Sequence, residues 1–81
     1  MTIKVLLFSV LRPLGGGDSV KVEVAAGATV LDLLDRLYRD HPALKDWDDK
    51  VRVAVDLDYV ERDHVLTEGC EVAVMPPVQG G

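Results

Sequence analysis

The fold of this chain is decided by residues 29–40, which read Thr-Val-Leu-Asp-Leu-Leu-Asp-Arg-Leu-Tyr-Arg-Asp. Apolar side chains recur there at the i, i+3, i+4, i+7 and i+8 spacing of one helix face, at Val30, Leu33, Leu34, Leu37 and Tyr38. Thr29 can cap the first turn and Asp32 can complete a capping box, while Pro42 stops the helix near Asp40. The pattern predicts a single amphipathic helix that must bury one face.

Two strands are predicted before the helix. Residues 2–11 are apolar on both faces, so we expect this strand to lie inside its sheet. One face carries Ile3, Val5 and Leu7, and the other carries Leu6, Phe8 and Val10. Residues 12–18 contain Pro13 and a run of glycines and predict a turn, and residues 19–25 alternate apolar and charged side chains. The two strands should therefore form a hairpin.

Strands are also predicted after the helix. Residues 51–57 and Cys70–Met75 read as strands, with short extended pieces between them. A helix placed between strands allows the first and last strands to pair in parallel. The element order predicts an α+β fold, the β-grasp or ubiquitin-like arrangement, in which a mixed sheet packs on one main helix. We expect a β-grasp domain over residues 1–75 and a flexible, extended Gly-Gly tail over residues 76–81.

The composition limits the partners and the location. A chain of 81 residues has room for one small domain. A net charge of −5 disfavours nucleic acid, which requires a clustered basic surface. No apolar run is long enough to cross a membrane, Lys4 interrupts any signal-peptide pattern, and the single cysteine, Cys70, suits a reducing compartment. These features predict a cytoplasmic protein that binds neither nucleic acid nor membrane.

The polar side chains form no recognisable catalytic or metal-binding pattern. Asp46, Asp48 and Asp49 cluster, but the glycine and the distal glutamate of a calcium loop are missing. His41 and His64 have no partner for nucleophilic catalysis that the sequence reveals. We therefore expect no bound metal, no tightly bound cofactor, and a chain that is not catalytic alone.

The chain ends in Pro76-Pro77-Val78-Gln79-Gly80-Gly81. The prolines fix the direction in which the chain leaves the domain, and glycines, which lack side chains, can thread a narrow channel. Fully extended, the residues after Met75 reach about 20 Å. That length could place the Gly81 carboxylate inside the active site of another protein. On these residues alone, a frayed terminus explains the glycine pair equally well.

An exposed apolar patch is predicted beside this tail. If the helix covers the face that carries Val5, the opposite face carries Phe8, and Met75 points the same way by alternation. Little chain remains to cover these side chains, and such a patch usually marks a protein interface. The alternative is that residues 58–66 fold over the patch and form a second, minor core.

Together these residues resemble the small subunit of molybdopterin synthase over the whole chain. The resemblance is carried by the helix and by four segments, which are residues 3–8, 53–56, 66–73 and 76–81. A Gly-Gly end alone is a weak signal, whereas Pro-Pro-Val-x-Gly-Gly after a Gly-x-Glu-Val strand is a fairly specific one. Related sulfur carriers, such as the thiamin-pathway protein, share the fold and the Gly-Gly end but seldom carry the double proline.

The resemblance implies a chemistry for the tail. The Gly81 carboxylate would be adenylated by a partner that resembles the ubiquitin-activating enzyme, with ATP and magnesium, and then converted to a thiocarboxylate. The large catalytic subunit of the synthase would accept the tail, which Gly80 allows to thread. The sulfur would then pass to precursor Z during molybdenum cofactor biosynthesis.

The resemblance also implies a contact surface. The positions that match the family's apolar contact residues are Phe8, Tyr59 and Met75. The tail adds Pro76, Pro77 and Val78. Asp56 departs from the family, which often has Asn at this position. An aspartate can still accept hydrogen bonds, but it lacks the amide donor of asparagine.

Two alternatives stay open. A carrier of the same chemistry could serve thiamin synthesis or tRNA thiolation, or could be attached to lysines as a protein modifier. A plain interaction domain could carry an inert tail. Cys70 could be confused with the sulfur-bearing group, but the resemblance places the sulfur on Gly81.

Overall fold

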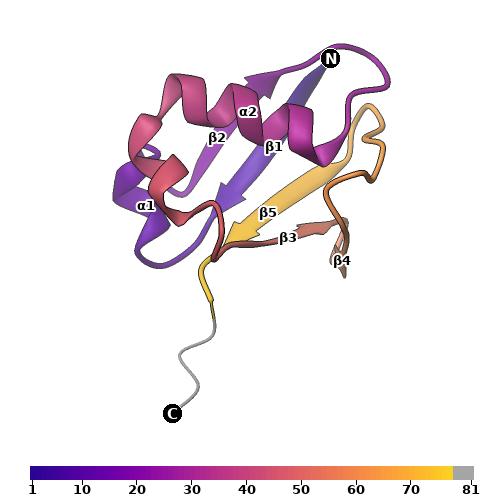
Figure 1. Cartoon of the computed structure of the whole chain (residues 1–81). Helices are drawn as coiled ribbons and strands as arrows, with labels where there is room; N and C mark the ends of the chain where they lie inside the picture. Colours follow the sequence, from indigo (N-terminus) through magenta and orange to yellow (C-terminus); the bar gives the residue numbers. More distant parts are fainter. Residues whose placement is uncertain (78–81) are drawn as a thin grey trace.

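The computed structural model describes residues 1–77. Five strands and three helical segments follow one another along the chain (Figure 1). In order they are β1 (Thr2–Leu7), α1 (Leu11–Leu14), β2 (Ser19–Glu23), α2 (Val30–Asp40), the 3-10 helix η1 (Pro42–Trp47), β3 (Arg52–Val55), β4 (Asp58–Tyr59) and β5 (Glu71–Met75).

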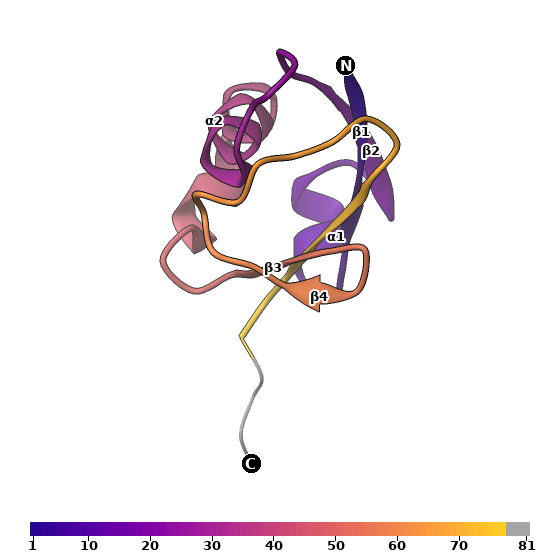
Figure 2. The ribbon, with the colours of Figure 1, turned by 90° about the vertical axis from the view of Figure 1, so that its right-hand side faces the viewer.

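All five strands form a single mixed sheet in the order β2-β1-β5-β3-β4. β1 pairs antiparallel with β2 and parallel with β5, whereas β3 pairs antiparallel with both β5 and β4. α2 crosses one face of this sheet (Figures 1 and 2). The predicted β-grasp fold is confirmed, including the hairpin of the first two strands, the parallel pairing of the first and last strands, and the internal position of β1.

The predicted ends of α2 are also confirmed. The Thr29 hydroxyl accepts a hydrogen bond from the Asp32 N–H at 3.3 Å, and the Asp32 carboxylate accepts one from the Thr29 N–H at 2.9 Å. This reciprocal capping box satisfies two N–H groups that have no partner inside the helix. The helix ends at Asp40, one residue before the His41–Pro42 step that disfavours helical backbone.

The core lies between α2 and the sheet face that it covers. The predicted apolar stripe of α2 is buried, and four of its residues are fully buried: Val30, Leu33, Leu34 and Leu37. They pack in one cluster with the inward side chains of β1 and β5, which are Ile3, Val5, Leu7, Val72 and Val74. Each aliphatic side chain removed from water contributes about 1.5–3 kcal/mol, so this single layer supplies most of the stability of the domain.

The predicted strand over residues 2–11 is too long. β1 ends at Leu7, and Ser9 adopts the left-handed region with φ +54°, which breaks the strand. The chain then turns into α1, so that Leu11 is fully buried in the core instead of continuing the sheet. Val10 consequently leaves the sheet and lies 48% exposed. Gly15, which follows α1, packs closely on Leu7, and a Cβ atom there would force the Leu7 side chain to move.

The predicted strand over residues 51–57 is too long, because its last two residues form a turn. β3 ends at Val55, and Asp56 and Leu57 have φ of +48° and +76°. The backbone reverses at these two residues, and β4 returns along β3. Val53 and Val55 face the core as predicted.

β5 ends at Met75, and Pro76 and Pro77 follow it with no regular secondary structure. Val78, Gln79, Gly80 and Gly81 lie outside the described residues, so the predicted division into residues 1–75 and 76–81 stays a prediction. Within residues 1–77, no helix is long and apolar enough to span a membrane.

Candidate functional site

The sheet face opposite α2 carries an apolar hollow. Outward side chains from three strands form its floor, where Ala54 of β3 lies opposite Ala73 of β5, and Leu6 of β1 lies opposite Ala73 on the other side. The hollow encloses about 190 Å³ and is lined by Leu6, Phe8, Ala54, Leu57, Tyr59, Glu71, Ala73 and Met75. This open-face hollow contains the three residues expected at a contact surface, Phe8, Tyr59 and Met75.

Alternation along the strands explains why these side chains gather on one face. Val72 and Val74 point into the core, so Ala73 and Met75 must point the other way. Small side chains at the centre and larger ones around it make the surface concave. The predicted apolar patch beside the end of β5 is therefore present, and it extends further along the sheet than the sequence indicated.

The chain after β4 leaves this hollow uncovered. The Leu31 N–H donates to the Arg62 carbonyl at 2.9 Å, and the Leu66 N–H donates to the Ala28 carbonyl at 2.8 Å. Leu66 is buried in the main core beside α2. Residues 60–66, which follow β4, therefore turn toward the helix side of the sheet, and the alternative that residues 58–66 form a second, minor core over the patch is wrong.

Three side chains around the hollow are unusually exposed for their size. Phe8 is 36% exposed, Tyr59 is 65% exposed and Leu57 is 94% exposed. Large apolar side chains that surround a concave apolar floor are typical of a protein interface. At about 190 Å³ the hollow is smaller than the pockets that usually hold a small molecule, which measure about 300–1,000 Å³.

The charges around the hollow differ between its two ends. Arg52 lies opposite Met75, where β5 ends, and its guanidinium carbon lies 5.8 Å from the centroid of the Tyr59 ring. This cation–π contact positions the tyrosine ring at the edge of the hollow. At the other end of β5 the exposed acidic residues are Asp56, Asp58 and Glu71.

Asp56 has a local structural role. Its backbone N–H donates to the Glu71 carbonyl at 2.9 Å, and its carboxylate accepts a hydrogen bond from the Glu71 N–H at 3.0 Å. Both bonds join the β3–β4 turn to the start of β5. The carboxylate acts here only as an acceptor, so the amide donor of the family's Asn is not needed for this contact.

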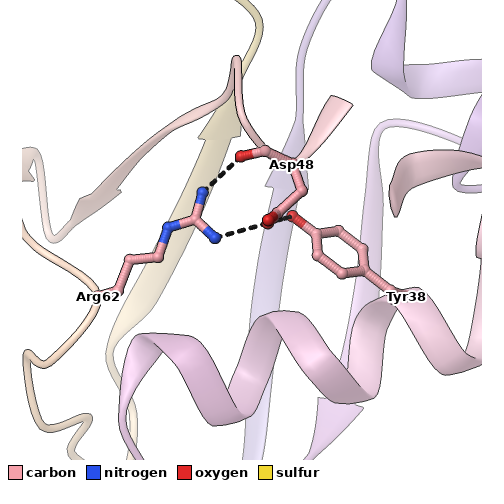
Figure 3. Close-up of polar contacts among 3 residues, drawn as sticks. All are labelled: Tyr38, Asp48 and Arg62. Atoms are coloured by element: carbon pink, nitrogen blue, oxygen red, sulfur yellow. Dashed lines mark hydrogen bonds and ion pairs between the residues drawn. The ribbon is translucent and has the colours of Figure 1, made fainter. Parts of the chain in front are cut away.

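A polar cluster fixes the chain that follows Tyr59 (Figure 3). The Tyr38 hydroxyl donates to the Asp48 carboxylate at 2.6 Å, and Arg62 Nη1 donates to the same carboxylate oxygen at 2.5 Å. Arg62 Nη2 donates to the Asp48 backbone carbonyl at 2.6 Å. The cluster joins α2, the residue after η1 and the chain after β4, so it adds to the backbone hydrogen bonds that hold this segment on the helix side of the sheet.

The same contacts change the acidity of the three groups. Burial and the hydrogen bond to Asp48 raise the pKa of Tyr38 above its ordinary value. Burial alone would raise the pKa of Asp48, but the hydrogen bonds from Tyr38 and Arg62 outweigh it and lower the pKa. The hydrogen bond to Asp48 raises the pKa of Arg62. All three groups therefore keep their ordinary charge near neutral pH.

A larger hollow, of about 460 Å³, lies between α2 and the connection that precedes it. Its lining includes Glu23, Asp32, Asp35, Arg36 and Arg39. The exposed helix charges make this a solvated polar surface. Over residues 1–77, no group of three or more His, Cys, Asp or Glu side chains could hold a metal ion. The open-face hollow is therefore the better candidate site.

Among the large apolar side chains around the hollow, Leu57 is the one that the sequence does not lead us to expect there. The alternation of residues 51–57 predicts a continuous strand, in which the exposure of Leu57 is not apparent. The signal that could locate it is the short gap of three residues, Asp56 to Asp58, between the strand that ends at Val55 and the apolar pair Tyr59-Val60. Such a gap predicts a tight hairpin, which would place Leu57 at its tip.

The fold and the hollow define a class of protein, the ubiquitin-like β-grasp proteins in which the last strand ends beside an exposed apolar surface. The chain belongs to the ThiS family, whose family model matches residues 5–81. It is 43% identical over 82 residues to the molybdopterin synthase sulfur carrier subunit of Escherichia coli (strain K12), and the match covers 98% of this chain and 99% of the relative.

Solved structures agree with this family. SAMP1, from Haloferax volcanii, superimposes with a TM-score of 0.88 and 32% identity over 100% of both chains. A putative molybdopterin converting factor subunit 1 from Pyrococcus furiosus superimposes with a TM-score of 0.86 and 35% identity, covering 96% of this chain and 99% of that one. The resemblance seen in the sequence is therefore confirmed at the level of family and fold.

Proposed function

We propose that this chain is the sulfur-carrier subunit of a molybdopterin synthase. The observation that carries the proposal is the apolar hollow of Phe8, Tyr59 and Met75, which lies where β5 ends and the chain continues toward Gly81. A carrier needs a surface that docks on a partner and a terminus that the partner can reach. The likeness to the sulfur carrier subunit of Escherichia coli supports the same function.

The proposed chemistry takes place on the terminal carboxylate of Gly81. A carboxylate is a poor electrophile, so sulfur cannot displace its oxygen directly. In the proposed first step the carboxylate attacks the α-phosphorus of ATP and releases pyrophosphate, which leaves an acyl-adenylate. A sulfide equivalent then attacks the acyl carbon and AMP departs, which leaves the thiocarboxylate. ATP and magnesium belong to the adenylating partner, which is of the ubiquitin-activating type.

The second proposed step takes place on the large catalytic subunit of the synthase. The open-face hollow docks on that subunit, and Pro76, Pro77 and Val78 direct Gly80 and Gly81 into its active site. There the sulfur of the thiocarboxylate is transferred to precursor Z. The chain contributes the sulfur and its position, whereas the large subunit contributes the catalytic groups. We place this reaction in the cytoplasm.

Cys70 is a poor candidate for the sulfur-bearing group. It is only 6% exposed and precedes β5, at the opposite end of the strand from Met75. A partner that binds at the end of β5 cannot reach it. The Cys70→Ser variant should therefore still transfer sulfur, and a folded but inactive Cys70→Ser chain would contradict the assignment to Gly81.

A second candidate function is attachment to lysines as a protein modifier, which the likeness to the small archaeal modifier protein SAMP1 favours. It requires the same activated terminus. The two candidates differ in what finally accepts the acyl group or the sulfur. Lysine conjugates of the chain would support the modifier, and sulfur transfer to precursor Z would support the synthase subunit.

Intact mass spectrometry tests the first step. The chain is incubated with an adenylating enzyme of the ubiquitin-activating type, ATP, magnesium and a sulfide source. We expect a mass increase equal to the replacement of one oxygen by sulfur. Two controls, deletion of Gly81 and addition of one residue after it, should abolish the increase. If a known carrier is converted in the same mixture and this chain is not, the proposal is wrong and the tail is inert toward that enzyme.

A further inference from the structure

The turn between β3 and β4 carries a residue that the turn geometry disfavours. β3 ends at Val55 and β4 begins at Asp58, so Asp56 and Leu57 are its only two residues. Both have positive φ, +48° and +76°. A two-residue hairpin turn with positive φ at both positions is of type I′, which strongly prefers glycine at the second position. In this chain that position holds leucine.

Leu57 contributes little to the stability of the isolated chain. Its side chain is 94% exposed, so it gains almost nothing from burial. A bulky side chain at positive φ is strained, and glycine at the same position would not be. Backbone strain of this kind persists mainly at binding and catalytic sites. The leucine is therefore costly to the folded monomer, and its 94% exposure leaves little burial to offset the cost.

The position of Leu57 indicates what offsets that cost. The side chain lines the same open-face hollow as Phe8, Tyr59 and Met75, so it continues the surface that is proposed to dock on the synthase. In sequence it lies between the exposed carboxylates of Asp56 and Asp58. The hairpin tip therefore presents one apolar side chain with an acidic residue on each side.

We infer that Leu57 is an anchor residue that inserts into an apolar socket on the large subunit of the synthase, with lysine or arginine side chains at the rim of the socket. The inference rests on the proposed function, because it names the partner from it. Burial of the leucine in the complex provides affinity that the monomer does not gain. The carboxylates of Asp56 and Asp58 meet the basic rim, which steers the encounter and excludes partners with an acidic surface there.

The strain is tested by the stability of the free chain. Leu57→Gly should raise the melting temperature by about 4–8 °C, because glycine adopts positive φ without strain. Leu57→Gln removes the apolar surface but keeps a side chain with a Cβ, and should leave the melting temperature nearly unchanged. Leu31→Gln is the matched control, since Leu31 is 47% exposed on α2 and lies outside the open-face hollow.

The anchor is tested by isothermal titration of the full chain into the large subunit from the same source. Leu57→Gly and Leu57→Gln should each weaken binding at least about tenfold, whereas Leu31→Gln should bind as the unmodified chain does. Asp58→Asn should slow association at low salt, and the difference should shrink as the salt concentration rises.

The outcomes separate the inference from the proposed function. If the unmodified chain binds and Leu57→Gly is more stable but binds more weakly, the anchor is supported. If the unmodified chain binds and both Leu57 variants bind equally well, the anchor is wrong while the docking of the hollow stands. If the unmodified chain does not bind the large subunit, both the inference and the proposed partner are wrong.

Discussion

The two faces of one sheet differ in what their side chains do. On β5, Val72 and Val74 face α2 and are 0% and 2% exposed, whereas Ala73 and Met75, on the other face, are only partly buried. The inward residues are branched and fill a dense core, and the outward residues leave a concave apolar surface. A single strand thus supports folding with one set of side chains and offers a docking surface with the other.

The comparison predicts that substitutions on the two faces affect different measurements. The largest effect on stability should come from the helix side. Leu34→Ala removes a fully buried side chain and should cost about 2–5 kcal/mol of unfolding free energy, because the cavity cannot close completely. Chemical denaturation monitored by circular dichroism measures this loss. A change below about 1 kcal/mol would mean that the core is not where the folded chain gains its stability.

A substitution on the open face should have the opposite profile. Tyr59→Ala should weaken binding to the large subunit by about 1–3 kcal/mol, while unfolding stability changes by less than about 1 kcal/mol, since the side chain is 65% exposed. Titration calorimetry and denaturation of the same preparation give both values. Unchanged binding together with lost stability would show that Tyr59 contributes to folding and not to docking.

The polar cluster should have an intermediate effect that depends on pH. Tyr38→Phe removes the hydroxyl that donates to Asp48 and should cost about 1 kcal/mol at neutral pH. The pKa of Asp48 is lower in the folded chain than in the unfolded chain, so the native state binds fewer protons in the pH range between the two values. The stability that this carboxylate contributes is therefore present at neutral pH and is lost as the pH falls through its folded pKa.

The acid side of the stability curve measures this effect. Because Tyr38→Phe removes one of the hydrogen bonds that lower the pKa of Asp48, the variant should lose less stability between neutral and acid pH than the unmodified chain. Parallel curves for the two proteins would show that the hydroxyl does not affect the titration of the carboxylate.

The smallest effect is expected at Asp56. Asp56→Asn keeps an oxygen that can accept the Glu71 N–H, and Asn tolerates positive φ, so the unfolding free energy should change by less than about 0.5 kcal/mol. Asp56→Ala, which removes the acceptor, should cost about 1 kcal/mol. If the two variants were equally stable, the side-chain bond would contribute nothing to the turn.

Much of the fold could be predicted because local and tertiary preferences agree. Local preference and burial in the core favour the same structure at the capping box of Thr29, along the apolar stripe from Val30 to Tyr38, and in the alternating strands. The structure has all three features. The positive φ of Ser9 could not be predicted, since serine does not favour it, and at Leu57 only the short gap before Tyr59 indicates the turn, since leucine does not favour positive φ either. At Ser9 the burial of Leu11 decides the backbone, and this contact is distant from any local pattern.

The candidate site could be predicted only in part, because contacts between distant segments also decide its shape. Phe8, Tyr59 and Met75 were expected at a contact surface, and they do line one hollow. Their contact with a partner stays a prediction, as do the roles of Gly80 and Gly81, which lie beyond the described residues. The path of residues 58–66 depends on hydrogen bonds between segments that are distant in the sequence. The alternation of side chains along one strand therefore could not show whether these residues cover a sheet face.

The measurement that tests the account most directly follows the sulfur on Gly81. The thiocarboxylated chain is mixed with the large subunit and precursor Z, and the mass of the chain is measured as product forms. We predict that the chain returns to the carboxylate mass as molybdopterin appears, and that a chain with one residue added after Gly81 forms none. Retention of the sulfur in the presence of both partners, or transfer of the chain to lysines instead, would contradict the account.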